Sequence, residues 1–284
     1  MRQTAAALLA GVVALVVSAC QDTQTPAPDG VIEYVALGDS YTAAPGVPTT
    51  DPADPCFRSD HNYPSLIAEQ LPDTRLTDVS CSGATTAAMA DEQNPGIRPQ
   101  LDALSDGTDL VTISIGGNNE GVYLTWFQQC QALAVSDPQG SPCADANRTA
   151  DGDALLDKVA PLEDAVTEVI EAVQDRAPRA RVIVVTYPQP MPDRGTCPDL
   201  IPYAAGDYAY INSIMSAQND AIVAAAEATG VEWIDVEKAS RGHDVCSEEP
   251  WINGSLTDDW SRGTALHPFP EEQAAIAKLV LRRF

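Results

Sequence analysis

The sequence has few basic residues. Lys and Arg together number 16 among 284 residues, against 41 Asp and Glu, and the formal net charge at pH 7 is −25. An acidic surface of this kind repels both phosphate backbones and anionic lipid headgroups. The charge therefore excludes nucleic-acid binding, and electrostatic docking on an anionic membrane, as leading hypotheses.

Histidine is also scarce, and the spacings typical of metal sites are missing. The three histidines are His61, His243 and His267, and no two cysteines form a CxxC pair. Structural and catalytic zinc sites rely on closely spaced Cys and His ligands. We therefore expect no metal and no organic cofactor.

The first residues are typical of a bacterial export signal. Arg2 gives a positive start, and residues 5–17 are apolar but too few to span a bilayer comfortably. Val17-Ser18-Ala19-Cys20 resembles a lipobox, in which the signal is cut before a cysteine that is then lipidated. We expect a signal peptide over 1–19, lipidation of Cys20 and a tether over 20–30, which predicts an extracellular or cell-surface protein anchored to the membrane. A simple secretory signal cut at Ala19, with Cys20 incidental, is the alternative.

Six cysteines remain after Cys20 is set aside. An even number in an exported chain indicates disulfides, here three, and sequence alone permits fifteen pairings. Neighbourhood in the sequence favours the pairs Cys56–Cys81, Cys130–Cys143 and Cys197–Cys246. Each of these would close a long loop beside an expected strand end.

Alternating apolar strands and amphipathic helices predict the fold. Buried strands are expected at 31–37, 76–80, 110–115, 181–187 and 231–236. Apolar residues at three- and four-residue spacing predict helices, the clearest at 153–175, 207–229 and 271–283. The strands that begin at 31, 110 and 181 are rich in Val and Ile and show little strict alternation, which suits a parallel sheet covered on both faces. No repeat or linker divides residues 31–284, so we expect one domain, a three-layer α/β/α sandwich with a five-stranded parallel sheet.

Two short blocks at opposite ends of the chain carry the chemistry. Gly38-Asp39-Ser40 follows the first apolar run, and His267-Pro268 precedes the last amphipathic segment. A serine is a poor nucleophile at neutral pH unless a base lies within hydrogen-bond reach, and histidine is the usual base. This pair predicts an ester-cleaving enzyme, although the G-x-S-x-G motif of α/β-hydrolases is absent around Ser40.

Two further blocks complete a recognisable set. Cys81-Ser82-Gly83-Ala84-Thr85 and Gly116-Gly117-Asn118-Asn119 lie between the first two blocks, each after an expected strand. With these four blocks in order, residues 31–284 resemble the SGNH (GDSL-type) hydrolases, in particular their secreted three-disulfide esterase and lipase branch. The resemblance implies a flavodoxin-like fold, Ser40 as nucleophile and His267 as general base. It also implies an oxyanion hole formed by the backbone N–H groups of Ser40 and Gly83 and the side-chain amide of Asn118.

The sequence departs from the family pattern at two positions. Thr264 stands where the family often has Asp, three residues before the histidine, so no carboxylate can orient His267 from there. We expect the backbone carbonyl of Thr264 to orient the ring, with Asp258 and Asp259 as the alternative acids. Asn119 replaces an aspartate that is usually structural, and we expect this change to be tolerated.

Several other residues have a plainer interpretation. His243 has a neighbouring carboxylate and is the rival base, but its position beside Cys246 favours a structural loop. Asp39 is expected to hold the turn before the nucleophile through local hydrogen bonds. His61 is expected at the surface, and Trp260, in the loop before His267, is a candidate for lining the cleft.

The sequence thus predicts a secreted or lipid-anchored serine ester hydrolase, an esterase or lipase that forms an acyl-Ser40 intermediate. The expected partner is a small-molecule or lipid ester, and the expected state is a monomer. Two alternatives stay open. One is an acetyl-sugar deacetylase that uses the same site on cell-wall glycans or xylan. The other is a non-catalytic envelope lipoprotein that keeps the fold and binds a cell-wall ligand.

Overall fold

The computed structural model describes residues 30–256 and 260–284. The expected signal peptide, Cys20, the tether up to residue 29, Asp258 and Asp259 lie outside the described residues. Five parallel strands form one sheet in the order β2-β1-β3-β4-β5. The strands are β1 (Ile32–Gly38), β2 (Thr74–Asp78), β3 (Leu110–Ser114), β4 (Arg181–Val185) and β5 (Glu232–Ile234). This order is that of flavodoxin-like sheets, so the predicted fold class is confirmed.

Helices connect and cover the strands. The longer α-helices are α2 (Tyr63–Gln70), α7 (Leu162–Arg176), α8 (Asp207–Thr229) and α10 (Pro270–Leu281). The shorter ones are α1 (Ser40–Ala43), α3 (Val122–Thr125), α4 (Gln131–Ala134), α5 (Pro142–Asn147), α6 (Ala154–Val159) and α9 (Val236–Ala239). Single turns of 3-10 helix lie at Thr86–Met89, Gln100–Ala103 and Asn119–Gly121, and a π-helical turn lies at Trp126–Cys130.

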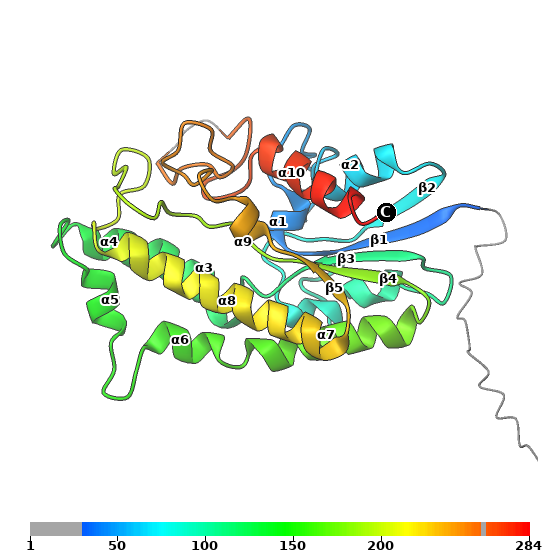
Figure 1. Cartoon of the computed structure of the whole chain (residues 1–284), viewed down its shortest axis with the longest axis horizontal. Helices are drawn as coiled ribbons and strands as arrows, with labels where there is room; N and C mark the ends of the chain where they lie inside the picture. Colours follow the sequence, from blue (N-terminus) through cyan, green and yellow to red (C-terminus); the bar gives the residue numbers. More distant parts are fainter. Residues whose placement is uncertain (1–29, 257–259) are drawn as a thin grey trace, which may run out of the picture.

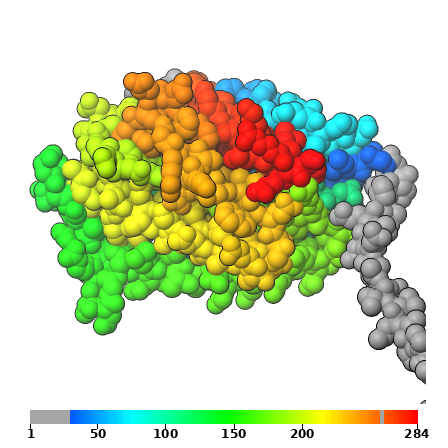
Figure 2. Space-filling model, viewed as in Figure 1, coloured from blue at the N-terminus to red at the C-terminus, as the bar shows by residue number. Residues whose placement is uncertain are grey.

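The helices form two layers, one on each face of the sheet (Figure 1). Helices α2 and α10 pack together on one face, where Tyr34, Ile67 and Ile276 belong to a common buried cluster. Helices α7 and α8 pack together on the other face, over a larger cluster that includes Val111 and Val166. Figure 2 shows the C-terminal segment, in red, beside the cyan segment that contains α2.

The composition of the strands reflects the helices that cover both faces of the sheet. All five residues of β3 are buried, because helices exclude water from both of its faces. The edge strand β2 instead carries charged Arg75 and Asp78, and none of its residues is fully buried. Charge on an edge strand also discourages pairing with another sheet.

One predicted helix is wrong in its extent. The pattern over 153–175 predicts a single helix, but the structure divides it into α6 and α7 at Pro161. Proline has no N–H to donate within a helix, and its ring clashes with the carbonyl four residues earlier. The proline therefore ends one helix and begins the next, while the apolar spacing continues across the break.

The cysteines in the structure form three disulfides. Cys56 is bonded to Cys81, Cys130 to Cys143 and Cys197 to Cys246, which are the three pairs expected from the sequence. Within residues 30–256 and 260–284, no helix combines the length and the apolar character needed to cross a bilayer.

The strand order places two of the sequence blocks beside each other. Strands β1 and β3 are neighbours, and their carboxyl ends, Gly38 and Ser114, are paired in register. The chain then leaves β1 toward Ser40 and β3 toward Asn118. In doubly wound sheets the point where the strand order reverses, here between β1 and β3, is the usual place for a site.

Candidate active site

A cavity of about 860 Å³ opens at this edge of the sheet. Its lining includes Ser40, Gly83, Asn118 and His267, which come from four separate segments of the chain. The structure thus brings together the four residues that the sequence singles out. Much of the remaining lining is apolar and consists of Pro45, Pro52, Phe57, Tyr123, Leu124 and Trp260.

Ser40 is the first residue of the short helix α1. The carboxylate of Asp39 caps this helix by accepting from the N–H of Tyr41 at 2.9 Å. The first N–H groups of a helix have no partner within it. The N–H of Ser40 is such a group, because it donates to no other described residue. The nucleophile candidate therefore offers a free backbone donor at the cavity.

Gly38 and Gln100 fix the end of β1 just before this turn. The side-chain amide of Gln100 accepts from the N–H of Gly38 and donates to its carbonyl, both at 2.8 Å. A Cβ atom on Gly38 would lie 2.2 Å from the hydroxyl of Thr42 and 2.8 Å from the carbonyl of Ser114. Glycine is therefore required for the chain to turn this closely against α1 and β3.

Asp39 is a buried carboxyl with three donors around it. The hydroxyl of Tyr187 donates to Oδ2 at 2.6 Å, the N–H of Tyr41 donates to Oδ1, and the amide of Asn118 lies 3.4 Å from Oδ2. Burial raises the pKa of Asp39 to about 7, and the hydrogen bond from Tyr187 opposes that rise. The Tyr187 hydroxyl in turn accepts from the N–H of Gly117 at 3.0 Å, so Asp39 links the nucleophile turn to the loop after β3.

Gly83 supplies a second free backbone donor. Its N–H donates to no other described residue, and its φ of +80° lies in the region that favours glycine. An added Cβ would meet only the amide nitrogen of Gln93, at 3.6 Å. The positive φ, rather than crowding, is therefore what requires glycine at this position.

Asn118 supplies a side-chain donor at the same cavity. Its amide nitrogen donates to the carbonyl of Ala84 at 3.0 Å, while its contact with Asp39 is long. Asn119, the residue at a departure from the family pattern, binds Thr86 through both ends of its amide, at 3.0 and 2.8 Å. These bonds join the loop after β3 to the segment that follows Gly83.

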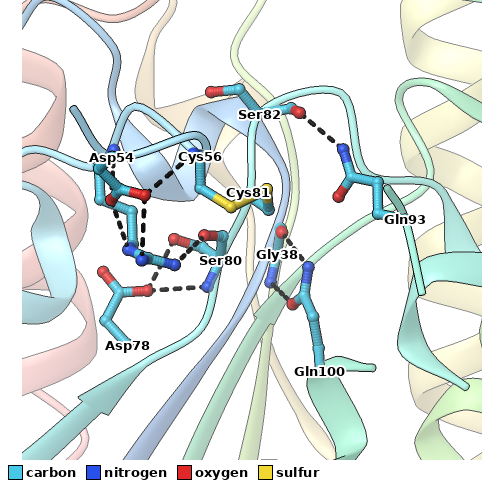
Figure 3. Close-up of a disulfide and its surroundings, with 10 residues drawn as sticks. Gly38, Asp54, Cys56, Asp78, Ser80, Cys81, Ser82, Gln93 and Gln100 are labelled. Atoms are coloured by element: carbon cyan, nitrogen blue, oxygen red, sulfur yellow. Dashed lines mark hydrogen bonds and ion pairs between the residues drawn. A yellow bond between two sulfur atoms is a disulfide. The ribbon is translucent and has the colours of Figure 1, made fainter. Parts of the chain in front are cut away.

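A disulfide holds the chain two residues before Gly83, and Figure 3 shows it beside Ser82. Cys56 is bonded to Cys81, and the carbonyl of Cys56 accepts from the N–H of Ser82 at 3.2 Å. The amide of Gln93 donates to the carbonyl of Ser82 at 2.8 Å, as the dashed line in Figure 3 marks. The peptide groups on either side of Ser82 are therefore held from both directions.

His267 is half-buried at the cavity wall. Its Nδ1 lies 2.8 Å from the carbonyl oxygen of Ala265. A carbonyl can only accept, so Nδ1 carries the proton and Nε2 is left as the basic nitrogen. Burial lowers the pKa of His267 below its usual value of 6.5, and the Ala265 carbonyl opposes that shift. The ring can therefore act as a neutral base at neutral pH.

The prediction that Thr264 orients this ring is wrong. The carbonyl of Thr264 accepts from the backbone N–H of His267 at 3.1 Å, and the ring reaches back to Ala265 instead. Leu266, which lies between Ala265 and His267, has a φ of +55°, and this left-handed conformation turns the chain back on itself. The turn thus uses the Thr264 carbonyl itself and presents the next carbonyl to the ring.

The Oγ of Ser40 donates to no described residue, and no bond joins it to His267. Catalytic hydrogen bonds are often long or poorly aligned when no substrate is bound. The missing bond is therefore compatible with Ser40 and His267 acting together. The other two histidines do not line the cavity. His243 stacks on Trp251 at 4.5 Å and binds the carbonyl of Glu249, and His61 pairs with Asp60.

Within the described ranges, no cluster of three or more His, Cys, Asp or Glu side chains could hold a metal ion. Sequence reasoning did not identify the contacts that Gln100, Tyr41, Tyr187 and Ala265 make at the site. No local pattern marks them, because their contacts depend on segments brought together by the fold.

Known proteins provide an independent comparison. The sequence matches the GDSL-like Lipase/Acylhydrolase family over residues 36–274. It is 43% identical over 232 residues to Lipase 2 of Streptomyces coelicolor, covering 79% of this chain and 77% of that protein. Two crystal structures align with 89% of this chain and 100% of their own, each with a TM-score of 0.71. They are an extracellular lipase from Streptomyces rimosus, at 27% identity, and phospholipase A1 from Streptomyces albidoflavus, at 26%.

Proposed function

The chain belongs to the GDSL-like lipase/acylhydrolase family and is a carboxylic ester hydrolase, and from this we propose that Ser40 is its nucleophile and His267 its general base. The observation that carries the assignment is one cavity lined by Ser40, Gly83, Asn118 and His267. The first two of these residues carry backbone N–H groups that have no other partner among the described residues.

The reaction divides into two steps. The Oγ of Ser40 attacks the ester carbonyl carbon while its proton moves to Nε2 of His267. The bond from this carbon to the alcohol oxygen then breaks, and His267 gives its proton to the departing alcohol. A water molecule attacks the acyl-Ser40 ester with His267 again as base, which releases the acid and restores the serine.

The oxyanion formed in each step needs donors aimed at one point. We assign the N–H groups of Ser40 and Gly83 and the amide of Asn118 to this role. The long contact from Asn118 to Asp39 is easily given up, since the same amide nitrogen keeps its bond to Ala84. Such preorganised donors stabilise the transition state without reorganising during the reaction.

The substrate proposed is an ester with a sizeable apolar acyl chain. The cavity wall carries Phe57, Leu124 and Trp260, residues that remain 47%, 53% and 59% exposed. Exposed apolar side chains gathered at a site favour an apolar ligand that covers them. The acetyl-sugar alternative would leave most of this surface uncovered.

We propose that the chain is exported as a monomer and that 31–284 is the hydrolase domain. Three disulfides fit an oxidising compartment. The signal over 1–19 and lipidation of Cys20 would then anchor the protein at the cell surface. Intact mass of the cell-associated protein tests this, because lipidation adds acyl mass at Cys20 and a Cys20→Ser variant would appear in the medium.

Labelling by a fluorophosphonate tests the nucleophile. Purified residues 31–284 should gain the mass of one adduct, and Ser40→Ala should gain none. Ser213→Ala, on the exposed face of α8, is the matched control and should label like the wild type. An adduct that persists in Ser40→Ala would refute the assignment.

A panel of p-nitrophenyl esters of rising chain length, measured beside acetylated xylan, tests the substrate class. We expect kcat/KM to rise from acetate to medium-length chains, with little release of acetate from xylan. Leu124→Ser should reduce the preference for long chains and leave p-nitrophenyl acetate hydrolysis less affected. A preference for acetylated xylan would instead support the deacetylase alternative.

A further inference from the structure

The side chain next to the nucleophile reaches the segment that carries the base. The hydroxyl of Tyr41 donates to the carbonyl of Leu266 at 2.8 Å, across 225 positions of sequence. Tyr41 follows Ser40, and Leu266 precedes His267. The two residues that must exchange a proton therefore have neighbours joined by one buried hydrogen bond.

We propose that Tyr41 is a positioning residue that holds the His267 segment against the nucleophile. The proposal rests on the proposed function, in which His267 takes the proton of Ser40. Tyr41 does not touch the reacting atoms. Its role is to fix the distance and direction from which the base approaches them.

The peptide group before His267 is held at both of its polar ends. Its carbonyl, which belongs to Leu266, accepts from the hydroxyl of Tyr41 at 2.8 Å and over a longer distance, 3.4 Å, from that of Tyr123. Its N–H donates to the carbonyl of Thr264 at 3.1 Å. The orientation of this peptide plane fixes the direction in which the side chain of His267 leaves the backbone. The Ala265 carbonyl then sets the rotation of the ring.

The conformation of Leu266 explains why such a bond is needed. This leucine is fully buried and has a φ of +55°, a conformation that a bulky residue rarely adopts. A residue of this kind keeps the left-handed conformation only when its surroundings enforce it. The bond from Tyr41 acts directly on that peptide group and favours the turn that presents Ala265 to the ring.

Tyr41 is itself held firmly enough to transmit position. Its N–H donates to Asp39, and its carbonyl accepts at 3.0 Å from the amide of Gln273 on α10. Its ring meets the edge of Tyr187 at 5.4 Å and lies 5.7 Å from the ring of His267. Tyr41 is thus bonded to the chain on both sides of His267, to Leu266 before it and to Gln273 after it.

Tyr41→Phe tests the proposal because it removes only the hydroxyl. We expect kcat to fall by about 10-fold, because a less firmly placed His267 ring is less often in position to take the proton of Ser40, with KM within about twofold. The rate of fluorophosphonate labelling should fall in parallel. The acidic limb of the pH profile of kcat/KM should also move up toward 6.5, because a looser ring is better hydrated.

Tyr208→Phe is the matched control. Tyr208 is buried away from the cavity, and its hydroxyl donates to the carbonyl of Ile201 at 2.7 Å and accepts from the N–H of Cys197 at 3.2 Å. Urea unfolding should show a comparable loss of stability for both variants, and near-UV circular dichroism gives the folded fraction to which each kcat is referred. Only Tyr41→Phe should change kcat and the pH limb.

Each outcome bears on a separate statement. If folded Tyr41→Phe matches Tyr208→Phe in kcat and in pH profile, the positioning role is refuted. Ser40→Ala and His267→Ala in the same assay report on the proposed function by themselves. Should both remain active, that function fails, whereas their inactivity beside an unimpaired Tyr41→Phe removes only the positioning role.

Discussion

The two sides of the cavity are built in different ways. On the nucleophile side, Gly38, Asp39 and the loop before Gly83 are held by Gln100, by Tyr187 and by the Cys56–Cys81 disulfide. On the base side, the ring of His267 is held by one neutral carbonyl, that of Ala265, and its peptide group by Tyr41, Tyr123 and Thr264.

The difference fits the role proposed for each side. Oxyanion donors gain most when they need not reorganise, so several independent links around the nucleophile are useful. A base that receives and returns a proton needs a defined tautomer and a pKa near the working pH. A backbone carbonyl supplies the tautomer without adding a charge that would raise the pKa.

Removing the base is the most severe test of this contrast. His267→Ala should lower kcat/KM for a p-nitrophenyl ester by about 10⁴-fold, because no other described residue lining this cavity can take the proton of Ser40 at neutral pH. His243→Ala should stay within about twofold of the wild type, since its ring stacks on Trp251 away from the cavity. Comparable losses in both variants would remove the distinction between the two histidines.

Removing an oxyanion donor from the nucleophile side should have the next largest effect. Asn118→Ala should lower kcat by about 10²- to 10³-fold with little change in KM. Asn119→Ala is the informative comparison, because it breaks the two bonds to Thr86 and should act mainly on the free energy of unfolding. Steady-state kinetics together with urea unfolding measure both variants. The oxyanion role would be wrong if Asn118→Ala lost stability and kept kcat.

The sequence could predict those parts of the fold that follow from burial, but not those that depend on one residue's local chemistry. The five strands follow from apolar runs, and each boundary agrees within two residues because burial sets the pattern. The helical spacing over 153–175 hid the break at Pro161, whose local chemistry overrides that pattern.

The site residues likewise fall into those that the sequence could identify and those that it could not. The motif residues that line the cavity could be identified from short local blocks. Ala265 could not, since the choice of carbonyl depends on the left-handed φ of Leu266. Gln100 and Tyr41 have contacts 62 and 225 residues away, and no local pattern carries that information.

Loosening the nucleophile side without touching a reacting group should give a smaller effect. Gln100→Leu removes both bonds to Gly38 and leaves a buried N–H without a partner. We expect a loss of ~1–3 kcal/mol in the free energy of unfolding and about a 10-fold slower reaction with fluorophosphonate. Gln174→Leu, which removes a bond to the carbonyl of Thr229, should keep the wild-type rate. Equal labelling rates in the two variants would mean that the links behind Gly38 serve stability alone.

The smallest expected effect concerns the protonation of His267, measured through the pH dependence of kcat/KM. Only neutral His267 can accept the proton of Ser40, so kcat/KM should rise as pH passes its pKa. Burial holds that pKa below 6.5 although the hydrogen bond to the Ala265 carbonyl opposes the shift, and this carbonyl carries no negative charge that would raise the pKa further. The midpoint of the rising limb should therefore lie below 6.5, and the activity should be level at neutral pH. A carboxylate partner would move the midpoint to 6.5 or above, and that result would contradict orientation by a carbonyl.

Asp39 provides the control for this measurement, since its pKa of about 7 places a second buried group in the same range. Asp39 becomes charged as pH rises through that value, which is unfavourable in a buried site unless Tyr187 and Tyr41 donate to it. If the limb belongs to His267, Asp39→Asn should lower the plateau yet keep the midpoint, because the Ala265 contact is untouched. A limb that disappears in Asp39→Asn would instead assign the titration to the nucleophile side and show that the charge state there, rather than the base, sets the activity at low pH.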